Sequence, residues 1–239
     1  MKSFLLAACL GATAFTAQAQ DKFTVSGKAD LVSNYVWRGI DQGSGFSVQP
    51  QLGLSYKGVF LTAWGSQSLT RGDAQEFDLT LGYTWRGLTV QVADLWWGGL
   101  SQPYGYYKHG PKNNPLDGGH HFEGTVSYRI SDKVPLTLSW NTWFAGADVR
   151  RANGNRCFST YINAAYDVAL PAAITLTPSV GFTPWRGYYH DKAAVTDISL
   201  KAARDMAWND KFTLPLSVQV VVSPPRDHVY LVAGVSVGF

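Results

Sequence analysis

The sequence predicts an all-β fold, a transmembrane up-and-down antiparallel β-barrel of about twelve strands. Three observations lead to this prediction. Apolar and polar residues alternate along segments of about ten residues, the length of a strand that crosses a bilayer at a tilt. Tight turns alternate along the chain with longer loops, which is the asymmetry of membrane barrels. Charged residues make up 15% of the chain, well below the roughly 25% of soluble domains.

Residues 1–19 have the pattern of a signal peptide. Lys2 precedes an apolar run at 4–15, and Ala17-Gln18-Ala19 is a small-x-small cleavage site. The run is shorter than the roughly 20 apolar residues that a spanning helix needs. We therefore expect residues 1–19 to be removed on export and residues 20–239 to form the barrel.

The expected strands follow from the alternation. In the first segment, 23–38, apolar side chains share one face and residues such as Lys28 and Asp30 share the other. Equally clear alternation occurs at 46–56, 76–85, 121–130, 136–144, 174–183, 212–220 and 229–239. Weaker strands are expected near 59–68, 88–98, 157–167 and 194–204. The total is even, as bacterial single-chain barrels require, and we expect both termini on the periplasmic side.

The connections and the aromatic residues support a barrel over a soluble sandwich. Tight turns are expected at 56–58, 85–87 and 131–133, and long loops at 99–119, 146–156 and 184–193. Aromatic residues at the strand ends predict two girdles at the levels of the lipid headgroups. The lower girdle would contain Tyr56, Tyr83, Trp85, Tyr128, Tyr166 and Phe239, and the upper girdle Tyr35, Trp37, Trp97, Trp140, Phe144 and Phe182.

Charged residues on the polar strand faces are the candidate functional residues. In a barrel those faces enclose the lumen, where charges set ion selectivity. The candidate pore-lining residues are Lys28, Asp30, Arg38, Glu76, Asp78, Glu123, Arg129, Asp197 and Lys201. Alternatively, these side chains pair across neighbouring strands and fill a narrow lumen. Their mixed signs predict weak selectivity.

One segment carries a family resemblance. Ser33-Asn34-Tyr35-Val36-Trp37-Arg38-Gly39-Ile40-Asp41-Gln42 resembles the Ser-x-Tyr-x-x-Arg-Gly-x-x-Gln pattern that opens the TorF-type porins. The segments 49–52, 58–66 and 76–83 are also similar to that family. The resemblance covers about the first third of the mature chain, and it implies an outer-membrane barrel without an assigned substrate or catalytic residue.

These observations predict a function in the outer membrane of a diderm bacterium. We expect passive or weakly selective diffusion of small hydrophilic solutes, with no cofactor and no metal. The terminal Phe239 resembles the signal read by the outer-membrane insertion machinery. The near-neutral charge, +3 for the whole chain, argues against nucleic-acid binding.

Two other functions stay open. A closed structural or adhesion barrel could bind external ligands through its long loops, above all 99–119. A rim protease could use the neighbouring pairs His190-Asp191 and His228-Asp227 to activate water. We expect no enzyme, because loops rich in polar residues contain such pairs often.

Overall fold

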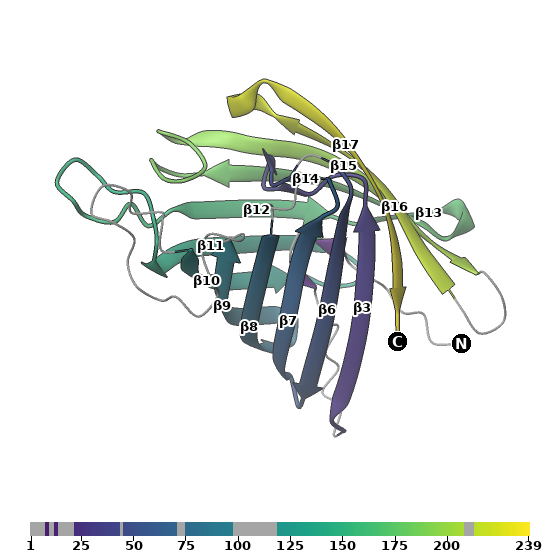
Figure 1. Ribbon diagram of the computed structural model, residues 1–239. Helices are drawn as coiled ribbons and strands as arrows, with labels where there is room; N and C mark the ends of the chain where they lie inside the picture. The colour runs from purple at the N-terminus through teal and green to yellow at the C-terminus, as the bar shows by residue number, and fades with distance from the viewer. Residues whose placement is uncertain are drawn as a thin grey trace.

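In the computed structural model, twelve antiparallel strands form one closed barrel within the described residues, which are 8–9, 12–13, 22–43, 45–70, 75–97, 119–207 and 213–239 (Figure 1). The strands are β3 (Thr24–Val32), β6 (Ser47–Tyr56), β7 (Val59–Ser68), β8 (Gln75–Trp85), β9 (Leu88–Trp97), β10 (His120–Arg129), β11 (Leu136–Gly146), β12 (Thr160–Tyr166) with its continuation β13 (Val168–Leu170), β14 (Ile174–Thr183), β15 (Ala194–Ala207), β16 (Thr213–Ser223) and β17 (His228–Gly238). The predicted fold class and strand number are therefore confirmed.

The remaining elements are short. β1 (Ala8–Cys9) pairs with β2 (Ala12–Thr13), and β4 (Val36–Trp37) pairs with β5 (Ile40–Asp41). Single 3-10 turns occur at η1 (Pro171–Ala173) and η2 (Pro224–Arg226). Among the described residues, no helix has the length and apolar character needed to cross a membrane.

Each strand of the barrel pairs with its neighbours in the chain, and β3 closes the barrel by pairing with β17. This seam aligns Lys28 with Gly238 and Val32 with Gly234. Backbone hydrogen bonds between Gly27 and Phe239, 2.9 and 3.2 Å long, extend it to the end of the chain. Closure pairs the first strand of the barrel with the last, as a membrane-spanning sheet requires to satisfy its backbone groups.

The two ends of the barrel differ. One end, here called the turn end, carries tight connections such as Lys57-Gly58 and Arg86-Gly87. Both residues of each pair have positive φ (47° and 86°, then 48° and 85°), the geometry of a type I′ hairpin turn. The opposite end, here called the loop end, carries the connections 33–46, 147–159 and 184–193. The predicted loop 99–119 lies almost wholly outside the described residues.

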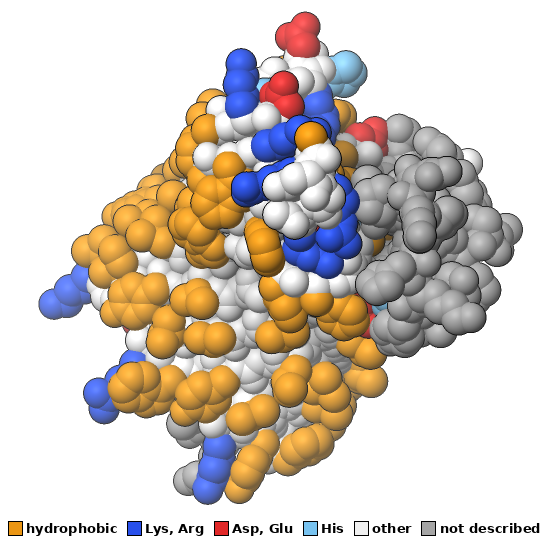
Figure 2. Space-filling model, turned by 90° about the vertical axis from the view of Figure 1, so that its left-hand side faces the viewer, with side chains coloured by type: hydrophobic (Ala, Val, Ile, Leu, Met, Phe, Trp, Pro, Cys, Tyr) orange, Lys and Arg blue, Asp and Glu red, His pale blue; other side chains and the backbone are white. Residues whose placement is uncertain are grey.

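The outer face of the barrel is apolar. Alternate side chains along the strands point outward and are exposed, including Leu81 at 58% and Leu231 at 66%. Figure 2 shows apolar side chains spread over the outer surface on one side of the barrel. All six residues expected in the lower girdle are exposed, as are three of those expected in the upper girdle, namely Trp140, Phe144 and Phe182.

Three predicted members of the upper girdle are placed differently. The first strand was expected to continue to Arg38, but β3 ends at Val32, and the chain then turns inward. Trp37 is consequently buried inside the barrel, with 7% of its surface exposed. Tyr35 and Trp97 pack against the same interior cluster. The prediction that these three side chains face outward is therefore wrong.

Candidate functional site

A hairpin crosses the lumen near the loop end. β4 and β5 are joined by a two-residue turn, Arg38-Gly39, in which both residues have positive φ, 52° and 76°. A Cβ atom on Gly39 would lie 2.7 Å from the carbonyl oxygen of Thr196 on β15. Only glycine therefore fits at this position, because it adopts a positive φ without strain and has no Cβ atom to collide with the wall. Because β15 lies three strands along the sheet from β3, the turn reaches a distant part of the wall.

Arg38 fixes the hairpin to another part of the wall. Its Nη1 and Nη2 donate hydrogen bonds to Oε2 and Oε1 of Glu123 on β10, at 2.6 and 2.7 Å. Nη1 also donates to the hydroxyl of Tyr189 in the loop 184–193. Both partners of the ion pair are buried, at 8% and 4% exposure. Two-point pairing of this kind fixes orientation as well as distance, because guanidinium and carboxylate planes match.

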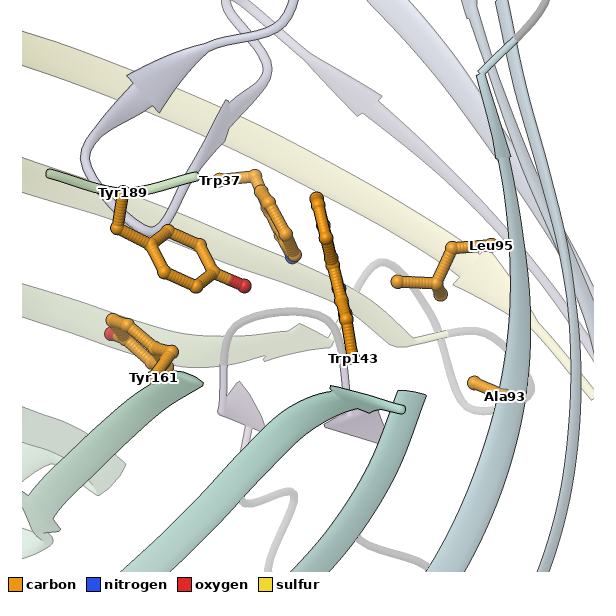
Figure 3. Packing of buried hydrophobic residues seen from close by; sticks show 6 residues of the cluster. All are labelled: Trp37, Ala93, Leu95, Trp143, Tyr161 and Tyr189. Atoms are coloured by element: carbon orange, nitrogen blue, oxygen red, sulfur yellow. The ribbon is translucent and has the colours of Figure 1, made fainter. Parts of the chain in front are cut away.

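Aromatic side chains surround the guanidinium group. Its carbon lies 4.3 Å from the ring centre of Trp37 and 4.7 Å from that of Tyr161. Trp37 stacks on Trp143 with ring centres 6.4 Å apart and 14° between the planes. Figure 3 shows these rings together in the interior, each from a different part of the chain. Trp143 is completely buried, so side chains fill the lumen at this level.

We call the hairpin, the Arg38–Glu123 pair and these rings the constriction. Tyr188 belongs to it as well, with its ring centre 4.8 Å from that of Trp143. Tyr189 is 2% exposed, and its burial raises the pKa of its hydroxyl. Tyr189 therefore stays protonated at neutral pH and acts toward Arg38 as a neutral acceptor.

Three more of the predicted residues lie at the level of the constriction. Asp197 is fully buried and accepts hydrogen bonds from the hydroxyls of Thr196 and Tyr161, at 2.9 and 3.2 Å. Glu76 and Asp78 share the inner face of β8, and Glu76 is 6% exposed. Glu76 is the register partner of Trp97, whose ring centre lies 5.3 Å from that of Trp37. Asp78 is the register partner of Trp64, whose ring centre lies 5.6 Å from that of Tyr35 in the inward loop.

The other predicted residues lie toward the turn end. Lys28 and Asp30 form an ion pair of 2.8 Å, and their side chains are 29% and 16% exposed. Arg129 pairs at 2.8 Å with Asp167, at the junction of β12 and β13. Lys201 lies on the inner face of β15 opposite Gln219. The nine candidates thus all point into the barrel, but only five of them meet at the constriction.

The aromatic part of the constriction was not predicted from the sequence. Trp143 has the same parity on β11 as Ser139 and Asn141, which are polar and face the lumen. An aromatic residue on a polar face is a signal that could have identified it, and the same holds for Tyr161 beside Asn163. Tyr188 and Tyr189 lie in a loop without periodicity, so no comparable signal exists for them.

The two His–Asp pairs at the rim stay separate. His190 Nδ1 lies 2.9 Å from Asp191 Oδ1, and Asp191 is 80% exposed. His228 Nδ1 instead lies 2.7 Å from the carbonyl oxygen of Arg226. Within the described part of the chain, no hydrogen bond or ion pair joins the two loops. The described residues also contain no group of three or more metal-ligating side chains.

Comparison with known proteins gives a family and a fold. Residues 16–218 match the model of a family described as "Bacterial protein of unknown function (Gcw_chp)". No curated protein matches the chain. The structure is similar to that of the KdgM porin in complex with disordered oligogalacturonate, with a TM-score of 0.50 and 8% sequence identity over 90% of this chain and 97% of that one. This likeness supports the barrel fold.

Two further solved structures are similar at lower scores. The NanC porin has a TM-score of 0.44 and 9% identity over 90% of this chain and 98% of that one. The Salmonella typhi OmpF complex with daunomycin has a TM-score of 0.41 and 9% identity over 92% of this chain and 98% of that one.

Proposed function

The chain belongs to the Gcw_chp family of bacterial proteins of unknown function, and we propose that it is a porin-like barrel of the outer membrane. In this proposal small hydrophilic solutes diffuse through the lumen passively or with weak selectivity. Residues 1–19 are the cleaved signal peptide, and Phe239 is read by the insertion machinery. The turn end, with both chain ends of the mature barrel, faces the periplasm. The finer assignment to the TorF-type porins rests on the segment 33–42.

The apolar outer face supports the membrane location. Burying one Leu or Val side chain contributes about 1.5–3 kcal/mol, and the barrel leaves such side chains exposed on strand after strand. Soluble monomers rarely expose apolar patches larger than a few hundred Å². The aromatic residues exposed at both strand ends, such as Trp85 at 55% and Trp140 at 45%, fit the two headgroup levels. Lipid is the environment that covers this surface.

The lining of the lumen carries the proposal of transport. Ser, Thr, Gln and charged side chains occupy the inner face, and Lys28 and Arg129 keep about a quarter or more of their side chains accessible to water. A water-filled interior would solvate the accessible parts of these ion-paired groups. The hairpin β4–β5 pairs only with itself and forms no part of the barrel sheet. It can therefore shift and admit solutes while the wall stays intact.

A closed barrel is the second candidate, and the constriction favours it. Trp143 and Asp197 are both completely buried there, as expected for a lumen filled by side chains. In that case the protein would act through ligands bound by its loops. Such a barrel would give no current at any salt concentration or voltage.

Planar bilayer recordings of the purified protein decide between the two candidates. The porin proposal predicts discrete current steps whose size grows with salt concentration. Absence of current from protein shown to be folded in the same detergent would refute it. Recovery of the mature chain as a soluble monomer without detergent would refute the membrane location itself.

A further inference from the structure

The constriction has an excess of acidic side chains. Glu123 is neutralised by Arg38, whose two terminal nitrogens are both bonded to it. Glu76, Asp78 and Asp197 have no ion pair with Lys, Arg or His within the part of the chain that the structure describes. The described residues therefore place three carboxyl groups without a cationic partner at this level. Toward the turn end, in contrast, Lys28 and Arg129 each pair with an acid.

Two acceptor oxygens at the constriction lack a partner. Oε2 of Glu76 and Oδ1 of Asp78 are buried without a hydrogen bond. Glu76 is itself more than nine-tenths buried. Burying an oxygen without a hydrogen-bond partner costs free energy. A cation bound between these oxygens would offset that cost. Carboxylate oxygens are among the ligands that hard cations prefer.

An anion finds fewer contacts at the same place. Both terminal nitrogens of Arg38 are engaged by Glu123 and Tyr189. The side-chain nitrogens without a hydrogen bond nearby include the indole nitrogens of Trp97 and Trp143, which are neutral, and Nδ1 of His121, whose ring packs on both. The indole rings present negative faces that attract cations. Side-chain charge and ring electrostatics therefore act in the same direction.

We propose that the constriction makes the barrel selective for small cations, alkali-metal or alkylammonium ions, with Glu76 and Asp78 as the selectivity-determining residues. This inference rests on the proposed pore function and goes beyond the weak selectivity that mixed charges predict. Rings of acidic side chains select cations by lowering their energy at the narrowest point and raising that of anions. The electrostatic field of the same acidic side chains would exclude polyanions.

Reversal potentials in a KCl gradient across a planar bilayer test the inference. The wild-type protein should give a reversal potential whose sign shows that K⁺ permeates in preference to Cl⁻. Asp78→Asn should reduce the K⁺ to Cl⁻ permeability ratio by about fivefold or more, the factor that a unit charge at about 4 Å exerts even in bulk water. Glu76→Gln should act in the same direction. Asp30→Asn is the matched control, because it removes the same type of carboxylate outside the constriction and should change the ratio much less.

The outcomes separate this inference from the pore proposal. Absence of any current would refute the pore itself. Current with a reversal potential near zero, or of the opposite sign, would overturn cation selectivity while the pore stands. Equal effects of Asp78→Asn and Asp30→Asn would overturn the assignment to the constriction. Tetramethylammonium in place of K⁺ tests the alkylammonium class with the same readout.

Discussion

Replacing Arg38 by alanine should open the constriction. The change removes both hydrogen bonds to Glu123 and the bond to Tyr189, and it leaves a buried carboxylate without its counter-charge. Removing one partner of a buried ion pair costs about 3–5 kcal/mol. The barrel sheet does not include β4 or β5, so this cost falls on the inward position of the hairpin. At 1.4 kcal/mol per factor of ten, the hairpin's closed-to-open ratio falls by about 10²- to 10³-fold or more.

Single-channel conductance is the readout for this variant. We expect Arg38→Ala to show larger or longer current steps than the wild type. Arg86→Ala is the matched control, because Trp85-Arg86-Gly87 forms the same two-residue turn with the arginine 5.0 Å from the tryptophan ring centre. That turn lies at the turn end, outside the lumen, so the conductance of Arg86→Ala should equal that of the wild type. Identical conductance for both variants, each folded, would refute the idea that Arg38 holds the constriction.

Four further predictions follow from positions described above. Gly39→Val should also raise conductance, since positive φ costs a β-branched residue about 1–3 kcal/mol and the new side chain would collide with the carbonyl of Thr196; unchanged conductance would contradict this. Trp143→Ala should widen the lumen and admit larger neutral polymers in exclusion assays, whereas an unchanged size limit would mean that other rings fill the gap. Leu81→Arg, in the middle of β8 on the outer face, should lower the free energy of unfolding from vesicles by about 2–4 kcal/mol, and a smaller loss would argue against lipid contact there. Deleting Phe239, which is 85% exposed, should reduce insertion in cells but not spontaneous folding into vesicles; equal yields in cells would exclude it as an insertion signal.

The strands could be predicted from the sequence because the barrel has two chemically different faces. Hydrophobicity alternates with a period of two wherever one face of a strand is apolar and the other polar. The expected strand at 59–68 was confirmed on this basis, as were the segments with clearer alternation. The same rule failed at 33–38. Alternation continued there past the end of β3, although the residues had entered an interior that also accepts aromatic side chains.

The constriction could be predicted only in part. Arg38 and Glu123 were identified as candidates because a charged residue on an inner face is unusual. Their ion pair joins positions that are distant in the sequence, so no local pattern predicts it. One signal was available in the triplet Trp-Arg-Gly. At 85–87 it forms a two-residue turn, and the same triplet at 37–39 forms the turn of the inward hairpin. At 185–187 it lies in a loop, so the triplet alone does not specify a hairpin.

The seam between β3 and β17 determines when the molecule can fold. The strand made first must wait for the strand made last, because Lys28 is aligned with Gly238 and neither edge has another partner in the barrel order. Until β17 has been synthesised and has reached β3, both edges present unpaired backbone groups to other chains. Pairing with other chains at these edges is therefore a hazard that ends only when the seam has closed.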